Sequence, residues 1–372
     1  MNPRNTLICT VGTSFFGNMM RLVEKTADKP ERWMLIHDAY EQKNWKLLAQ
    51  EMLQLAPSER VCGAEINTIE EVRGKNWLSM ENLFFLVSDT PEGNETGIFL
   101  RHYFGERHDL ALRNLEIVRV EHLQDQEPKR FKAQGLRNLV RCIGDIAQRV
   151  GGPQTIAIDA TGGYKAQIAV AVIVGQALNV PVFYKHERFS EIIDFPPLPI
   201  SFDYDVLGEY ADLLTDFERG QALTTVDIGT VDEKLRVLLV EVDLDGQMMY
   251  ELSPIGQIYL MGFRLRNPKP VNLKPSDAKR EPSFRDDHFP LGFEEYVKRI
   301  WRDTSWVVST HTLPYDRQRS IKGNGFYLFD GKLVGTYLDR NNFGARFELL
   351  LTDSTVNALI WAADFLNQKY RD

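Results

Sequence analysis

The first 200 residues alternate short β-rich runs with helical patterns, and this alternation restricts the fold more than any other feature of the chain. The β-rich runs lie at residues 7–11, 83–87, 115–118, 155–158 and 182–184. Strands that alternate with helices predict a parallel sheet flanked by helices. We therefore expect an α/β, Rossmann-like domain at the N-terminus.

Residues 195–199 read Phe-Pro-Pro-Leu-Pro, and they close this first region. Proline removes backbone donors from a sheet and restricts the residue before it. We therefore place a first domain at residues 1–200. A connector follows at 201–266, and a C-terminal effector domain at 267–372 begins with a polar linker at 267–290.

The connector carries the pattern of a winged-helix unit. Residues 235–240 fit a helix or a strand, Asp245-Gly246 marks a turn, and 248–250 form a short strand. Ser253 followed by Pro254 is a good helix start. Such a unit raises the alternative of a ligand-responsive transcription regulator, but few basic residues precede Arg264 and Arg266, so it fits DNA-groove binding poorly.

The C-terminal domain reads as a small α+β unit. An amphipathic helix is expected at 293–301 and a closing helix at 355–370. Between them, strands at 325–329 and 333–338 are joined by Asp330-Gly331, a strong hairpin signal, and a third strand follows at 346–351.

Charge is distributed unevenly over the 372 residues. The net charge is −8, yet residues 266–372 carry 17 Lys and Arg against 14 Asp and Glu. An anionic partner is therefore expected at the C-terminal end.

The three cysteines form no CxxC pair, which argues against a zinc site. The absence of a signal-like or membrane-spanning run predicts a cytoplasmic protein with no membrane partner.

Two segments share one design, in which an apolar strand runs into a Gly-, Thr- or Ser-rich loop and then a helix. They are residues 8–14 and 158–165. Glycine lets backbone approach a ligand closely, and free N–H groups at a helix start favour phosphate oxygens. In an open parallel sheet such loops lie at the ligand-binding edge. Neither matches the Walker or GxGxxG pattern, so an ordinary NTP or NAD site is not expected.

Val11-Gly12-Thr13-Ser14, Leu86-Val87-Ser88-Asp89-Thr90 and Asp159-Ala160-Thr161-Gly162-Gly163-Tyr164-Lys165 resemble the CARF domains of CRISPR-associated effectors. The resemblance covers roughly residues 5–200. It implies a homodimer that binds one cyclic oligoadenylate, most often cyclic tetra-adenylate, across its two-fold axis. The ligand-binding residues it implies are Gly12, Thr13, Ser14, Thr161, Gly162, Gly163 and Lys165. Ser88 could also reach the ligand, although Ser88, Asp89 and Thr90 are better suited to capping the next helix.

The segment Ile321-Lys322-Gly323-Asn324-Gly325-Phe326-Tyr327-Leu328, with the hairpin and helix after it, resembles the RelE toxin superfamily. That resemblance implies metal-independent cleavage of mRNA, generally on the ribosome. Such cleavage needs an aligned 2′-hydroxyl and positive charge on the phosphate oxygens. The catalytic residues we expect are Arg319, Lys322, Arg340 and Arg346 as phosphate clamps, with Tyr337 or a lysine handling protons.

A second interpretation is a metal-dependent PD-(D/E)xK nuclease. Asp316 and Asp330-Gly331-Lys332 meet its order of residues, which would bind a divalent ion. Asp330-Gly331 nevertheless has the chemistry of a hairpin turn. A third class, the helical HEPN ribonucleases, does not fit this strand-rich sequence. The favoured expectation is a type III CRISPR ancillary effector with no metal cofactor, in which cyclic oligoadenylate activates a RelE-like endoribonuclease.

Overall fold

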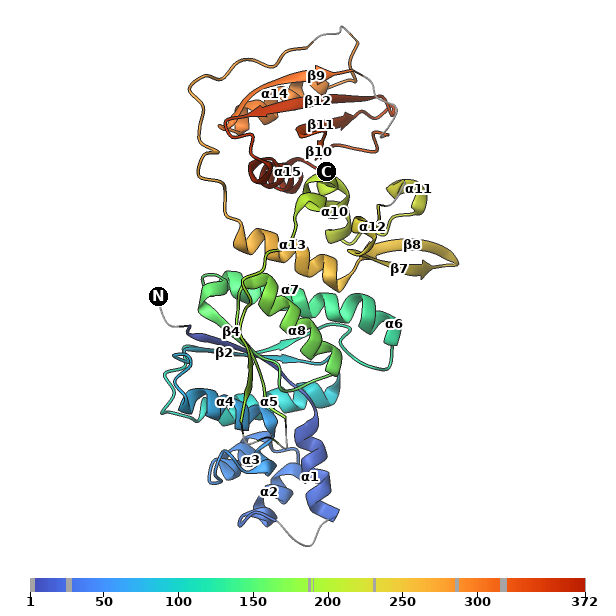
Figure 1. Cartoon of the computed structure of the whole chain (residues 1–372). Helices are drawn as coiled ribbons and strands as arrows, with labels where there is room; N and C mark the ends of the chain where they lie inside the picture. Colours follow the sequence, from blue (N-terminus) through green and yellow to red (C-terminus); the bar gives the residue numbers. More distant parts are fainter. Residues whose placement is uncertain are drawn as a thin grey trace. The chain divides into compact units, whose positions relative to one another are not determined.

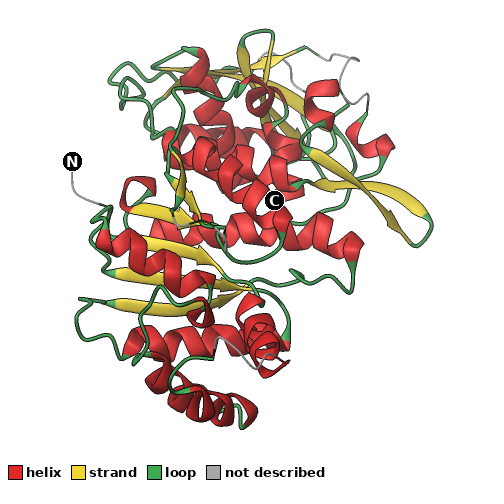
Figure 2. Cartoon of the chain, turned by 60° about the horizontal axis from the view of Figure 1, so that its bottom comes forward, coloured by secondary structure: helices red, strands yellow, loops and turns green. Residues whose placement is uncertain are grey.

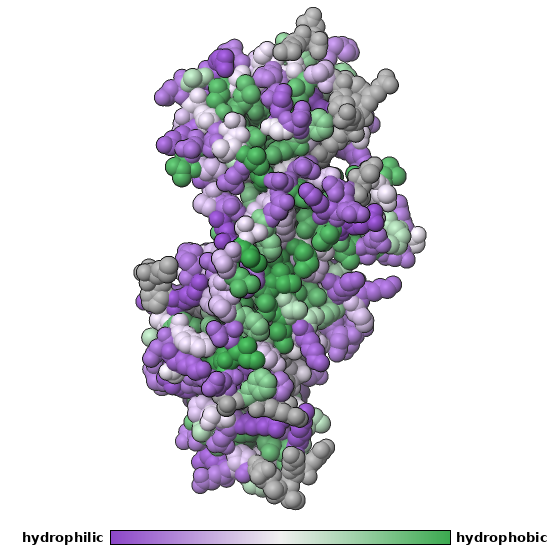
Figure 3. All heavy atoms as spheres, viewed as in Figure 1, coloured by the Kyte–Doolittle hydropathy of each residue, from purple (hydrophilic) through white to green (hydrophobic). Residues whose placement is uncertain are grey.

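The computed structural model describes residues 4–24, 29–186, 189, 191–229, 232–284, 288–314 and 320–371. The chain divides into two compact units, Met1–Ser201 and Phe202–Asp372. Among the described residues, no helix combines the length and apolar character needed to cross a membrane. Figure 3 shows that both hydrophilic and hydrophobic residues lie on the surface of the face drawn.

The N-terminal unit contains a six-stranded sheet in the order β3-β2-β1-β4-β5-β6. Its first five strands are parallel, and β6 runs antiparallel to β5. The strands are β1 (Thr6–Thr10), β2 (Asn82–Val87), β3 (Asn114–Arg119), β4 (Ile156–Asp159), β5 (Val182–Tyr184) and β6 (Ile193–Phe195). The predicted Rossmann-like α/β fold and its five strands are confirmed, whereas β6 was not predicted.

Helices cover both faces of this sheet, as expected for apolar strands that are buried on two sides. Figure 1 shows α4 (Ala64–Gly74) and α5 (Pro91–Gly105) on one face, with α7 (Leu136–Arg149) and α8 (Lys165–Leu178) on the other. The core on the α4 and α5 side contains Phe85 and Phe99. The smaller helices of this unit are α1 (Ser14–Glu24), α2 (Trp33–Glu41), α3 (Trp45–Met52) and α6 (Pro128–Arg130).

The C-terminal unit is built on an antiparallel sheet in the order β10-β11-β12-β9. Its strands are β9 (Val307–Leu313), β10 (Gly325–Phe329), β11 (Lys332–Leu338) and β12 (Gly344–Leu351). Helices α14 (Phe293–Asp303) and α15 (Val356–Tyr370) share a core with one face of this sheet. The predicted α+β unit is confirmed, and Asp330 and Gly331 form the hairpin turn with positive φ.

Strand β9 was not predicted, because the Val-Val-Ser-Thr-His-Thr-Leu run has no hairpin turn that links it to the next strand. Its partner is β12, more than thirty residues further along the chain. Part of the polar segment that was predicted as a linker is bonded to this strand. Backbone N–H groups of Ser276, Arg280 and Ser283 bond carbonyls of Ser305, Val308 and Thr310, so this segment runs along the outer edge of β9.

Residues 202–266 belong to the same compact unit as this sheet. They form α9 (Asp205–Glu209), α10 (Ala211–Glu218), α11 (Thr225–Ile228), α12 (Glu233–Arg236), β7 (Leu239–Leu244), β8 (Gln247–Leu252) and α13 (Pro254–Arg266). Figure 2 shows β7 and β8 as a long two-stranded ribbon. Ser253 caps α13 by accepting from Gly256 N, as predicted. The apolar side chains of Leu214 and Phe263 share a cluster with Ile360 of α15.

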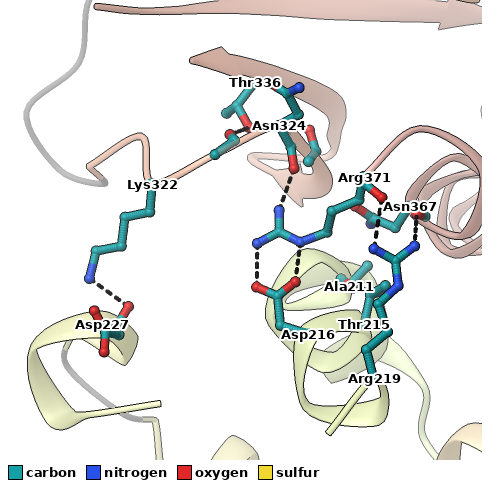
Figure 4. A network of polar contacts seen from close by, with 12 residues as sticks. Ala211, Thr215, Asp216, Arg219, Asp227, Lys322, Asn324, Thr336, Asn367 and Arg371 are labelled. Atoms are coloured by element: carbon teal, nitrogen blue, oxygen red, sulfur yellow. Dashed lines mark hydrogen bonds and ion pairs between the residues drawn. The ribbon is translucent and has the colours of Figure 1, made fainter. Parts of the chain in front are cut away.

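Asn367 of α15 closes the outer edge of β10. Its amide accepts from Phe326 N at 3.0 Å and donates to Phe326 O at 2.7 Å. The side chain is fully buried, so water does not compete for these groups. Figure 4 shows Asn367 next to Arg371, whose guanidinium bonds both carboxylate oxygens of Asp216 on α10.

Asn367→Ala should lower the free energy of unfolding by about 3 kcal/mol, because it leaves the N–H and carbonyl of Phe326 buried without partners. Urea denaturation of the full chain measures the change. Asn272→Ala, at an exposed position, is the matched control and should leave the transition in place. Equal stability of the two variants would contradict the proposed edge closure.

Candidate functional site

The two predicted glycine loops meet at the centre of the N-terminal sheet. Strand β1 lies between β2 and β4, so the chain order reverses there, and a ligand crevice is expected at the carboxyl ends of these strands. This is the position at which open α/β sheets bind ligands. Gly12 follows β1, and Gly162 and Gly163 follow β4. The structure therefore brings the two loops together.

Backbone atoms of the two loops are in direct contact. Thr10 Oγ1 donates to Gly162 O at 2.6 Å. A Cβ atom placed on Gly12 would lie 2.6 Å from Gly163 N, and one on Gly162 would lie 2.6 Å from Gly12 N. Glycine is required at both positions, because any side chain would force the two strand ends apart.

A buried carboxylate, which the sequence analysis did not identify, occupies the inner side of this contact. Glu65, in the first turn of α4, accepts from Gly12 N at 2.9 Å. Burial raises the pKa of the Glu65 carboxyl, whereas the bond from Gly12 lowers it. The Gly12 N–H is therefore bonded to the protein itself, and the prediction that Gly12 lines the ligand stays a prediction. The local signal is Gly63, whose φ of +90° turns the chain into α4.

Thr161 also faces inward. Its N–H donates to Asp159 Oδ1 at 3.0 Å, and its hydroxyl accepts from Lys185 N at 3.0 Å and lies 3.2 Å from the Thr68 hydroxyl. These bonds join the ends of β4 and β5 to α4. The predicted ligand residue Thr161 thus holds the loop in place, since its polar atoms are directed into the protein.

Three of the predicted residues remain on the surface of the crevice. Thr13, Gly163 and Lys165 are exposed. Gly163 adopts a φ of +98°, and Lys165 is the first residue of α8. Ser14 begins α1, and its side chain lies outside the described part of the structure. Among the predicted residues whose side chains are described, the groups exposed to a ligand are therefore the backbone at Gly163, the Thr13 side chain and the Lys165 ammonium.

Ser88 belongs to a helix cap. Its hydroxyl lies 2.9 Å from Thr90 Oγ1, and Thr90 accepts from Gly93 N at 3.0 Å at the start of α5. The residue is buried. The capping role expected for this segment is confirmed for Thr90, and Ser88 is bonded to the capping hydroxyl.

The C-terminal sheet places the predicted catalytic residues Arg346 and Tyr337 on opposite faces. Arg346 lies opposite Thr336 in the ladder, so Tyr337, the next residue, points the other way. The Tyr337 ring contacts Phe293 and Tyr296, and its hydroxyl donates to Leu291 O at 2.7 Å. Tyr337 therefore helps to pack α14 on the sheet.

The other predicted catalytic residues are also separated. Arg340 shares with Tyr337 a pocket of about 490 Å³. Lys322 lines a different pocket of about 500 Å³, where its ammonium donates to the carbonyls of Val226 and Asp227 on α11 (Figure 4). Arg319 lies outside the described residues. The expected single cluster is thus not formed by the four described side chains.

The structure also describes Asp330, Lys332 and Arg264, on which the metal-nuclease and transcription-regulator interpretations depend. Asp330 is an exposed turn residue, and Lys332 Nζ lies 3.1 Å from Glu348 Oε2. Asp316 of the metal-nuclease alternative lies outside the described residues. Arg264, one of the few basic residues of the winged-helix-like unit, bonds Asp364 and Glu218. Its charge is therefore neutralised within the protein.

Residues 60–198 match a family model described as CRISPR-associated protein (Cas_APE2256). The match covers less than half of the chain. It includes Glu65, Ser88 and the loop after β4, and it begins after the loop that holds Gly12. No curated protein matches this chain. The comparison supports a CRISPR-associated protein.

Asp159 makes the loop sensitive to pH. Burial raises the pKa of this carboxyl from its ordinary 3.8 to about 7, although bonds from Thr161 lower it and the Glu65 charge raises it further. The unfolded chain loses this proton near pH 4, whereas the folded chain keeps it to about pH 7. Between these values the folded state binds more protons, so this group makes stability fall as pH rises.

Asp159→Asn should therefore gain stability relative to the unsubstituted protein as pH rises from 4 to 8, by about 4 kcal/mol across the range. Thermal and urea unfolding at several pH values measure this difference. Asp145→Asn, at an exposed position on α7, is the control. Parallel pH profiles for Asp159→Asn and the unsubstituted protein would exclude the buried proton.

Proposed function

We propose that this protein is an ancillary effector of a type III CRISPR system, in which a cyclic oligoadenylate controls an endoribonuclease. The observation that carries the proposal is the meeting of two glycine loops at the central crevice of the sheet, within a unit that largely matches a CRISPR-associated family. The ligand is proposed to be cyclic tetra-adenylate, bound by a homodimer.

The chemistry of the crevice suits a ring of phosphates and ribose. Gly163 permits close backbone approach, and Lys165 adds a positive charge at the start of α8. Thr13 supplies a hydroxyl on the opposite loop. The inner bonds from Glu65 and Asp159 hold both loops in position before the ligand arrives, which reduces the entropy lost on binding.

The C-terminal unit is the proposed ribonuclease. Lys322, Arg340 and Arg346 place positive charge around its sheet, as cleavage of a phosphodiester requires. RNA can cleave itself through its 2′-hydroxyl, so the proposed reaction needs no metal. The proposed substrate is mRNA, with the ribosome as partner. A ligand activates this unit only if it binds the active arrangement more tightly than the resting one.

Calorimetry with cyclic tetra-adenylate tests the sensor. Lys165→Ala should weaken binding about ten-fold or more, because a charge-assisted contact with phosphate is lost. Lys46→Ala, at an exposed position on α3, should bind as the unsubstituted protein does. If the unsubstituted protein binds no cyclic adenylate of any ring size, the sensor is refuted.

An RNA cleavage assay with purified ribosomes tests the effector. Cleavage in EDTA that rises when cyclic tetra-adenylate is added is the expected result. Cleavage that appears only with Mg²⁺ or Mn²⁺ would favour the metal nuclease. A shift of promoter DNA in a gel, without RNA cleavage, would favour the regulator.

A further inference from the structure

One face of the C-terminal sheet carries a cluster of charged side chains that the sequence analysis did not assemble. Glu348 lies between an imidazole and an ammonium group on three neighbouring strands. Its Oε2 atom is 3.4 Å from His311 Nε2 on β9 and 3.1 Å from Lys332 Nζ on β11. Arg346 is two residues away on the same strand and therefore on the same face.

The strand register explains why these four residues meet. His311 lies opposite Glu348, which lies opposite Val334, while Arg346 lies opposite Leu313 and Thr336. The other face is occupied by Phe347, Leu349 and the helices α14 and α15. The two faces thus differ in chemistry. One face forms the apolar core, and the other carries imidazole, carboxylate, ammonium and guanidinium groups.

The cluster borders a pocket of about 200 Å³ with apolar walls. Arg346 and Lys332 line it together with Tyr327, Phe329 and Leu313. Phe329 is 43% exposed, so its ring is available to stack on a base. An exposed aromatic ring beside cationic groups fits a single-stranded nucleotide, because bases stack on rings and phosphates pair with cations.

The side chains of Glu348, His311 and Lys332 differ in their exposed fractions. The Glu348 side chain is 11% exposed, that of His311 29% and that of Lys332 50%. The carboxylate is therefore shielded, while the imidazole and the ammonium reach the surface. The carboxylate lies near His311 Nε2, so it can orient the imidazole and leave Nδ1 to receive a proton.

We propose that this face is the ribonuclease active site, with His311 as general base, Glu348 as the residue that positions it, Lys332 as general acid and Arg346 as the phosphate-binding cation. The inference rests on the proposed function, and it assigns that function to a site. It retains Arg346 from the predicted set and replaces Tyr337 with His311 as the proton acceptor.

The reaction balances without a cofactor. His311 takes the proton of the 2′-hydroxyl, and the 2′-oxygen forms a bond to phosphorus. The bond from phosphorus to the 5′-oxygen breaks, and the leaving oxygen takes a proton from the Lys332 ammonium. Arg346 neutralises the non-bridging oxygens. The products are a 2′,3′-cyclic phosphate and a 5′-hydroxyl, and proton exchange with solvent restores both side chains.

The test is single-turnover cleavage of a labelled RNA, with ribosomes and cyclic tetra-adenylate, in EDTA. His311→Ala should slow cleavage at least about 100-fold, as expected for loss of a general base. Lys332→Ala should slow it about ten-fold or more. Glu348→Gln, which keeps the shape but removes the charge, should slow it about ten-fold while RNA binding measured by fluorescence anisotropy stays within about two-fold.

Two controls match these variants. Lys298 on α14 pairs with Glu294 at 3.0 Å, and its side chain is 45% exposed. Lys298→Ala therefore removes a comparable lysine and carboxylate pair outside the cluster. His108→Ala removes an exposed histidine from the N-terminal unit. Both should cleave at the unsubstituted rate, and unchanged thermal unfolding of His311→Ala shows that its loss is not one of folding.

The outcomes separate the two proposals. If the unsubstituted protein cleaves RNA to 2′,3′-cyclic phosphate ends and His311→Ala does not, the assignment stands. If His311→Ala and Glu348→Gln both cleave normally, the assignment is overturned while the ribonuclease function survives. If the unsubstituted protein cleaves no RNA with any cyclic adenylate, both proposals fail.

Discussion

The contact between the loops after β1 and β4 is the constraint on which the N-terminal unit depends. These strands are neighbours at the centre of the sheet, so the glycine backbones meet without a side chain between them. Glu65 fills the inner side and satisfies Gly12 N. The same contact therefore packs the sheet and shapes the crevice. A substitution at either glycine disturbs both.

The C-terminal unit uses the two-residue period of its strands to separate two tasks. Alternate residues of β12 contribute Phe347 and Leu349 to the core and Arg346 and Glu348 to the opposite face. An apolar face packed against two helices keeps the strands in register, which in turn fixes the spacing of the charged groups. The position of His311 relative to Glu348 is thus set by packing on the far side of the sheet.

Local patterns predicted the elements well but the sites less well. Apolar runs identified five strands of the parallel sheet, and Asp330-Gly331 identified the hairpin, because these signals act over a few residues. Glu65 was missed because its partner Gly12 lies 53 residues away. The catalytic residues of the C-terminal unit were predicted from a family resemblance and from positive charge. Charge does not reveal strand register, so Tyr337 and Arg346 were grouped although they lie on opposite faces.

Protein groups bond backbone at both borders of the four-stranded sheet. The segment that contains Ser276 and Ser283 bonds along β9, and Asn367 satisfies Phe326 on β10. An incoming extended chain therefore finds the backbone groups at these positions already bonded and cannot add there as a fifth strand. A polymer that binds this sheet therefore lies on its face and contacts side chains. Its sequence preference is then set by the side chains of alternate strand residues.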